Sequence, residues 1–183
     1  KEKQVLVCAP SNAAVDLLVD KLSELGLQAL RIGHPARVTE QSLSKTLDHR
    51  ISIHPHYKEL RNLRKRMEQV RSTALKYKRK FGSHEKTQRR MMMQEAKLLK
   101  ADADQLEFYI VNDLLQNMEA ICCTLVGSSH PVLRGRKFTT AFIDEAGQAT
   151  EPAIWQAMLR AALFRVLSDR PCDVERYAAL ELA

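Results

Sequence analysis

The stretch FIDEAGQATEP, residues 142–152, decides the fold, because it places two adjacent carboxylates directly after an apolar run. Residues 138–143, FTTAFI, have the short apolar character of a buried strand, so Asp144 is expected at the carboxyl end of a strand with Glu145 beside it. Carboxylates are rarely buried unless a partner compensates their charge. Ligands of open parallel sheets bind outside the carboxyl ends of the strands, so the two acids predict a ligand site there.

The N-terminal part of the chain predicts a strand–helix–strand unit. QVLVCA at residues 4–9 suits a buried strand, and the helix after it has Asp16 in its first turn and ends at Gly26. LQALRIG at residues 27–33 returns as a strand, and AICCTLV at residues 120–126 predicts another. Such a unit is typical of an α/β domain, in which helices cover both faces of a parallel sheet.

From about residue 48 the apolar spacing changes to steps of three and four, which indicates two long helices with a turn near residues 82–86. Each helix would be roughly 35–40 Å long at about 1.5 Å per residue. We therefore expect an antiparallel helical hairpin over residues 48–117, inserted into an α/β domain formed by residues 1–47 and 118–183. The expected seam consists of Leu60, Leu63, Met67, Val70, Ala74, Tyr77 and Phe81, facing Met92, Ala96, Leu99, Ala103, Leu106 and Ile110.

The charge of the chain is uneven. The net charge is +7, and residues 48–100 hold sixteen Lys and Arg against five Asp and Glu, so the rest of the chain is net negative. A concentrated basic segment favours a nucleic-acid partner through counterion release, although a solvated helical face that binds nothing is the alternative. No apolar run is long enough to cross a membrane, and no membrane partner is expected. The four cysteines lack CxxC spacing and predict reduced, buried thiols, so we expect a cytoplasmic protein, or a nuclear one in a eukaryote.

A strand followed by two acids is the pattern that a nucleoside-triphosphate hydrolase needs. The first carboxylate, Asp144, would hold Mg²⁺, which takes only one or two carboxylates and keeps several waters. The second, Glu145, would orient and deprotonate the attacking water. The dipeptide also caps many helices, so a plain helix cap is the alternative interpretation.

Three motifs in register resemble those of superfamily 1 helicases, in the branch that includes senataxin and the nonsense-mediated-decay helicase. DEAGQATEP, residues 144–152, resembles their motif II. APSNAAVD at residues 9–16 resembles motif Ia, and CTLVGSS at residues 123–129 resembles the next motif that contacts nucleic acid. The order of the motifs along the chain matches that of the family. The insertion between APSNAAVD and CTLVGSS also matches.

The resemblance implies an incomplete RecA-like P-loop NTPase domain that binds ATP and Mg²⁺ in one cleft and single-stranded RNA or DNA across its top. It implies that Asp144 holds the metal, that Glu145 is the catalytic base and that Gln148 senses the γ-phosphate. It also implies that the basic hairpin grips or guides the strand. The residues that the resemblance assigns to the nucleic-acid backbone are Pro10, Ser11, Asn12, Thr124, Gly127, Ser128 and Ser129.

The sequence departs from the family in three respects. It contains no GxxxxGK[ST] loop to anchor the triphosphate, it lacks the second RecA-like domain that supplies further arginines, and LFRVLSDRPCDVERY at residues 163–177 stands where a Gly-Asp…Gln motif is expected. We therefore expect part of an ATP-dependent helicase or translocase whose 183 residues alone are inactive. The alternative is a non-catalytic nucleic-acid or protein interaction module derived from a helicase.

Overall fold

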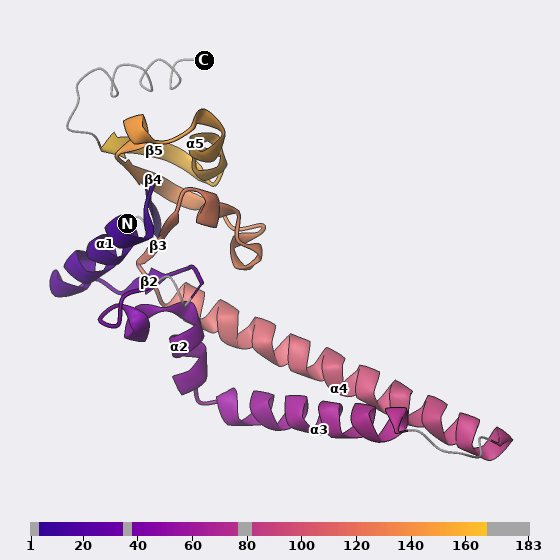
Figure 1. Ribbon diagram of the computed structural model, residues 1–183. Helices are drawn as coiled ribbons and strands as arrows, with labels where there is room; N and C mark the ends of the chain where they lie inside the picture. The colour runs from indigo at the N-terminus through magenta and orange to yellow at the C-terminus, as the bar shows by residue number, and fades with distance from the viewer. Residues whose placement is uncertain (1–3, 35–37, 77–81, 168–183) are drawn as a thin grey trace. The chain divides into compact units, whose positions relative to one another are not determined.

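The structure is a computed structural model that describes residues 4–34, 38–76 and 82–167. The chain divides into two compact units (Figure 1). The first comprises residues 1–50 and 114–183, and the second comprises residues 51–113.

The first unit is built on a five-stranded sheet in which every pair of neighbouring strands is parallel. The strand order β2-β3-β1-β4-β5 places β1 in the centre and gives an α/β fold, which confirms the predicted fold class (Figure 1). β1 and β3 are almost wholly buried, as their continuous apolar sequences predict. The strands are β1 Val5–Ala9, β2 Ala29–Arg31, β3 Ala120–Thr124, β4 Phe138–Asp144 and β5 Ala161–Leu167.

Helix α1, Asn12–Glu24, packs on the strands β1, β2 and β3. It begins at Ser11, whose side-chain oxygen accepts a hydrogen bond from the backbone N–H of Ala14 at 3.1 Å. It ends before Gly26, whose φ of 84° is the left-handed conformation that favours glycine after a helix. Its buried face includes Val15 and Val19, which join a core cluster with residues of β1, β2 and β3.

The chain after β4 differs from the sequence prediction. The apolar residues Trp155, Met158, Leu159 and Leu163 have helical spacing, which predicts a helix that continues to Leu163. In the structure α5 spans only Glu151–Met158, and Leu163 lies in β5 beside Thr140 of β4. The run AALFRVL is apolar without a clear period, so its local sequence does not distinguish helix from strand. The strand form gives the backbone groups of β4 their hydrogen-bonding partners on this side, which local spacing does not reveal.

The second unit contains the predicted helical hairpin, with different helix lengths. After a short helix α2, Leu47–Ile53, the hairpin consists of α3, Tyr57–Leu75, with 19 residues, and α4, Ser83–Gln116, with 34. The expected length of roughly 35–40 Å for each helix was therefore wrong, and residues 83–86, expected near the turn, lie in α4. Helix α4 begins at Ser83, and the break at residues 54–56 shortens α3 at its start.

The seam of the hairpin matches the predicted apolar positions. Leu60 is fully buried, as is Ile110, while Ala96, Leu99 and Ala103 are each less than a tenth exposed. Two ion pairs on the surface also join the helices, Arg64 to Glu107 at 2.5 Å and Arg66 to Glu95 at 3.2 Å. Exposed pairs of this kind contribute little, so burial of the seam is the main stabilising interaction. Tyr77 and Phe81, also assigned to the seam, lie outside the described residues.

Three cysteines are buried in the sheet, as predicted, and their thiols should be unreactive. Burial raises the pKa of the Cys122 thiol to about 12, and the hydrogen bond with Cys123, helped by burial, raises that of Cys8. Because the thiolate is the reactive form, we expect a thiol reagent at about pH 8 to label none of the three until the protein unfolds. A Cys172→Ser variant removes the one thiol outside the described residues, and rapid labelling of this variant in native buffer would contradict the expectation.

Within the described ranges, no helix is long and apolar enough to cross a membrane.

Candidate functional site

The parallel strands bring the predicted site residues to one edge of the sheet. Ala9 of β1 lies beside Thr124 of β3, and Cys8 of β1 lies beside Ile143 of β4. The residues that follow these strands therefore leave the sheet at the same edge. They comprise Pro10, Ser11 and Asn12 after β1, the turn Val126–Ser129 after β3, and Glu145 after β4, where Asp144 is the last strand residue.

The two acids occupy the junction between β4 and a short turn. Asp144 is half-buried at the end of the strand, whereas Glu145 is exposed and has φ 47° and ψ 40°. It is the only residue other than glycine with positive φ among the described residues, and this left-handed conformation costs about 1–2 kcal/mol. The backbone N–H of Gln148 donates to the Glu145 carbonyl at 2.9 Å and closes the turn. The strain is thus local to the predicted base, a common property of functional sites.

The turn after β3 is held together by its own polar groups. The backbone N–H of Gly127 donates to Thr124 Oγ1 at 3.1 Å. A Cβ atom at Gly127 would lie 3.0 Å from that oxygen and 3.2 Å from Cys123 Cβ, so a larger residue would push the turn away from β3. Ser129 is exposed, and its hydroxyl donates to Gln156 Oε1 of α5 at 3.0 Å.

Ser128 differs from its neighbours in this turn. Its side chain is fully buried, and its hydroxyl donates to the Leu125 carbonyl at 2.6 Å. A hydroxyl in this position stabilises the turn and does not face a ligand outside it. Of the residues after β3, the structure thus exposes Ser129 and partly exposes Thr124 and Gly127.

A buried ion pair beside the motif after β1 was missed by the sequence analysis. Asp16 was expected in the first turn of its helix, but α1 begins at Asn12 and has no acidic residue in that turn. The Asp16 carboxylate instead contacts Arg31 Nε at 2.9 Å. The side chains of Arg31 and Asp16 are 0% and 4% exposed. A second Arg31 nitrogen, Nη2, donates to Asn12 Oδ1 at 2.8 Å. The arginine stood inside a short apolar strand, LQALRIG, and that unusual position was the only available indication.

A family model described as an AAA domain matches residues 1–167. The chain belongs to this AAA domain family. Its sequence is 31% identical over 159 residues to DNA polymerase alpha-associated DNA helicase A of Schizosaccharomyces pombe, covering 87% of this chain and 23% of that protein. It is 29% identical over 189 residues to DNA-binding protein SMUBP-2 of Mesocricetus auratus, covering 97% of this chain and 18% of the relative. It is 33% identical over 151 residues to ATP-dependent helicase NAM7 of Saccharomyces cerevisiae, covering 81% of this chain and 13% of that protein.

These matches confirm the resemblance to superfamily 1 helicases. The AAA domain chain spans less than a quarter of the length of each of these three relatives.

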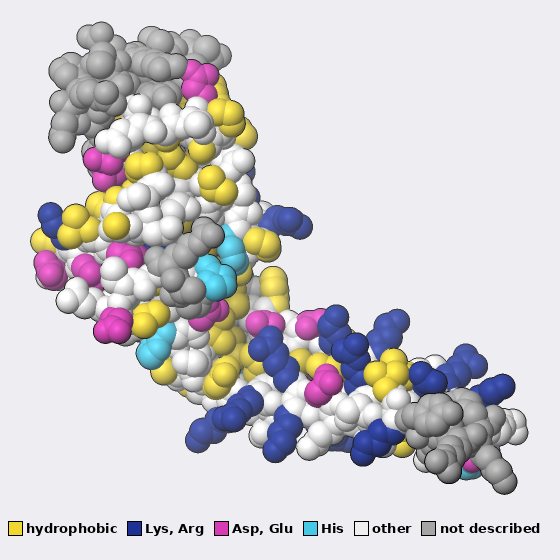
Figure 2. All heavy atoms as spheres, in the orientation of Figure 1, with side chains coloured by type: hydrophobic (Ala, Val, Ile, Leu, Met, Phe, Trp, Pro, Cys, Tyr) yellow, Lys and Arg dark blue, Asp and Glu magenta, His cyan; other side chains and the backbone are white. Residues whose placement is uncertain are grey.

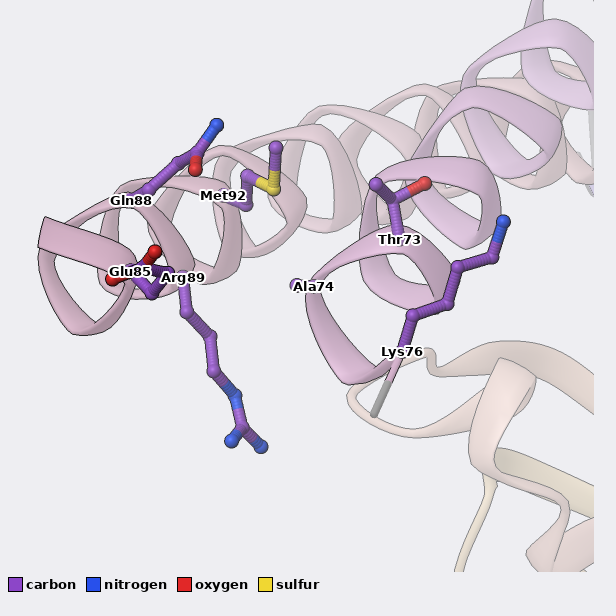
Figure 3. A pocket seen from close by; sticks show the side chains of 7 residues that line it. All are labelled: Thr73, Ala74, Lys76, Glu85, Gln88, Arg89 and Met92. Carbon is purple, nitrogen blue, oxygen red and sulfur yellow. The ribbon is translucent and has the colours of Figure 1, made fainter. Parts of the chain in front are cut away.

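The described residues of the helical hairpin line a groove and a smaller pocket. Figure 2 shows Lys and Arg side chains gathered on the hairpin helices. A groove of about 620 Å³ is lined by the apolar residues Met67, Met93 and Ala96 and by the basic residues Arg71, Arg90, Lys97 and Lys100. A smaller pocket of about 160 Å³ lies between the end of α3 and the start of α4, where Met92 and Ala74 meet polar side chains (Figure 3).

Proposed function

We propose that this chain supplies the hydrolytic carboxylates and part of the nucleic-acid contact of an ATP-dependent helicase or translocase. The observation that carries the proposal is the position of Asp144 and Glu145 at the carboxyl end of β4, in an all-parallel sheet. That edge is where open α/β sheets bind their ligands. The names of the relatives support the same activity, since two of the three are helicases and the third is a DNA-binding protein.

The donor set at this edge suits Mg²⁺ with a triphosphate. No group of three or more His, Cys, Asp or Glu side chains that could hold a metal lies within the part of the chain that the structure describes. Such a group is not required, because Mg²⁺ binds one or two carboxylates together with waters and phosphate oxygens. Asp144, half-buried at the end of a rigid strand, is the residue that would hold the ion. Bound there, Mg²⁺ would neutralise charge on the phosphates during transfer.

The remaining residues of the turn have separate roles in the proposal. Glu145, the residue directly after the one that would hold the metal, orients the attacking water and accepts a proton from it. The exposed side chain of Gln148 lies one short turn further along the chain. It contacts the γ-phosphate, so that release of this phosphate changes the conformation of the protein. The second RecA-like domain of the same protein completes the nucleotide site.

The nucleic-acid strand contacts the same edge of the sheet through small polar groups. Pro10, Ser11 and Asn12 form the start of α1, where backbone N–H groups attract phosphate. The sugar–phosphate backbone of the strand lies close to Thr124, Gly127 and Ser129. Ser128 holds these residues in place by stabilising the turn. Contacts of this kind hold a strand without reading its bases, so they serve RNA or DNA equally.

The 183 residues alone should not hydrolyse ATP. They contain no GxxxxGK[ST] loop, so the triphosphate lacks the amide nest and lysine that anchor it. We expect phosphate release from ATP by the purified chain to remain at background with Mg²⁺ and single-stranded nucleic acid present. Turnover that depends on Mg²⁺ and disappears in a Glu145→Gln variant would contradict this expectation.

The basic groove of the hairpin should contribute to single-strand affinity. Replacing Arg71, Arg90, Lys97 and Lys100 by glutamate reverses the charge of the basic residues that line the groove. We expect the affinity for a single-stranded oligonucleotide to fall at least about tenfold in low salt, and the slope of log K against log[salt] to flatten by up to about 3. Fluorescence anisotropy over a salt series measures both quantities.

A matched control reverses the same number of charges outside the groove. Lys58, Arg61, Lys65 and Lys86 are exposed and do not line it. If both variants lose affinity equally, the hairpin acts only through its total charge. If neither loses affinity, the hairpin does not contact the strand.

A further inference from the structure

The strongest unexplained feature of the first unit is the fully buried guanidinium of Arg31, at the end of β2. It is held by Asp16 through Nε at 2.9 Å, and its Nη1 donates to the carbonyl of Ile32. Its Nη2 donates to Asn12 Oδ1 at 2.8 Å. One carboxylate neutralises the charge of Arg31, so the bond to Asn12 is not needed for that purpose.

This bond fixes the orientation of the Asn12 side chain. A guanidinium only donates hydrogen bonds, so the amide must present its oxygen to Arg31. The two N–H donors of Asn12 therefore take no part in this bond, and they belong to the first residue of α1, at the carboxyl edge of the sheet. Rotating the amide by half a turn would place an N–H group of Asn12 against an N–H group of Arg31. The buried arginine therefore prevents this rotation.

We propose that Arg31 is a positioning residue that presents the amide N–H groups of Asn12 to a phosphate of the bound strand. The inference deepens the proposed function and rests on it. Arg31 itself does not contact nucleic acid, because its side chain is inaccessible. It acts through Asn12 alone, and it converts an ordinary asparagine at a helix start into an oriented donor.

The surroundings of Arg31 keep it in one conformation. The second oxygen of Asp16, Oδ2, accepts the backbone N–H of Thr39 at 2.9 Å, which ties the carboxylate to the chain after β2. Gly33 approaches so closely that a Cβ atom there would overlap Arg31 Nη1. The guanidinium therefore has little freedom to turn away from Asn12, as positioning requires.

A double-mutant cycle on the full-length protein tests the inference, with affinity for a single-stranded oligonucleotide as the measurement. Arg31→Lys keeps the charge beside Asp16 but loses the planar fork that reaches Asp16 and Asn12 together. We expect Arg31→Lys and Asn12→Ala each to weaken binding about five- to tenfold. The affinity of the double variant should be no lower than that of the single variant that binds less tightly. Effects that multiply, or an Arg31→Lys protein that binds as tightly as wild type, would overturn the inference.

Asn12→Asp provides a second test that leaves the arginine paired. Aspartate still accepts the Arg31 bond and is favourable at a helix start, so the thermal midpoint should not fall. It replaces the two donors with a charge that repels phosphate, so binding should weaken by about tenfold or more. Unchanged binding by this variant would also overturn the inference.

Ser42→Ala serves as the matched control. It removes a hydrogen bond of 3.0 Å to Asp20 from the same segment after β2, without changing charge or contacting Asn12. Its affinity should equal that of wild type, and a loss equal to that of Arg31→Lys would show that the segment acts only through its fold and would overturn the inference. A wild-type protein that binds no oligonucleotide would instead refute the proposed function itself.

Discussion

Replacing Glu145 by glutamine in the full-length protein should lower kcat for ATP hydrolysis by about 10²–10⁴-fold, the usual contribution of a positioned general base. Glutamine has nearly the same shape, so the left-handed turn at this position remains, but the amide cannot accept the proton of the attacking water. The affinity for a non-hydrolysable ATP analogue should stay within about twofold, because the lost interaction is made only in the transition state. Steady-state phosphate release and analogue titration measure the two quantities.

Glu119→Gln is the control for this experiment. Glu119 immediately precedes β3, so it lies at the opposite edge of the sheet, where its carboxylate accepts the backbone N–H of Gln28 at 2.9 Å. The substitution Glu119→Gln removes the same charge as Glu145→Gln and should leave kcat unchanged. If Glu145→Gln also retains kcat, the acid beside Asp144 is a structural turn residue, and the hydrolytic role proposed for this edge must be abandoned.

Replacing Asp16 by alanine should lower the free energy of unfolding by about 3–5 kcal/mol, the usual cost of removing one partner of a buried ion pair. The variant leaves the Arg31 guanidinium, which is 0% exposed, without its carboxylate and also removes the acceptor of the Thr39 N–H. Urea unfolding can be followed through the fluorescence of Trp155, the single tryptophan of the chain.

Asp20→Ala is the matched control on the same helix. Asp20 pairs with Lys45 at 2.7 Å, and these two side chains are 25% and 23% exposed. Because water screens this pair, its loss should cost only about 1 kcal/mol. The double variant Asp16→Leu with Arg31→Met should recover part of the lost stability, since an apolar pair needs no charge compensation. Equal losses for Asp16→Ala and Asp20→Ala would show that burial does not set the strength of the first pair.

Much of the fold could be predicted because its elements have strong local patterns. The apolar runs at β1, β3 and β4 gave their positions to within a few residues, and spacing by three and four gave the hairpin seam from Leu60 to Ile110. A helix end was predicted where a specific residue marks it, as Gly26 does after α1. The end of α5 was missed because no such residue marks it.

The candidate site was only partly predictable. Its acids were recognisable because they directly follow an apolar run, and the parallel register then brings Asp144 to the edge where β1 and β3 also end. The left-handed conformation of Glu145 and the burial of Ser128 were not predictable, since both depend on how a turn packs against strands distant in sequence.

The sequence by itself determined the class of the fold, the family and the identity of the acids, because each depends on residues that are adjacent or regularly spaced. Only the tertiary structure decided the partners of Arg31. Asp16 and Asn12 both lie in α1, whereas Arg31 ends β2. A buried guanidinium is stable only where folding brings the Asp16 carboxylate and the Asn12 amide oxygen around it. Local spacing does not encode these contacts, because they arise from the packing of α1 against β2.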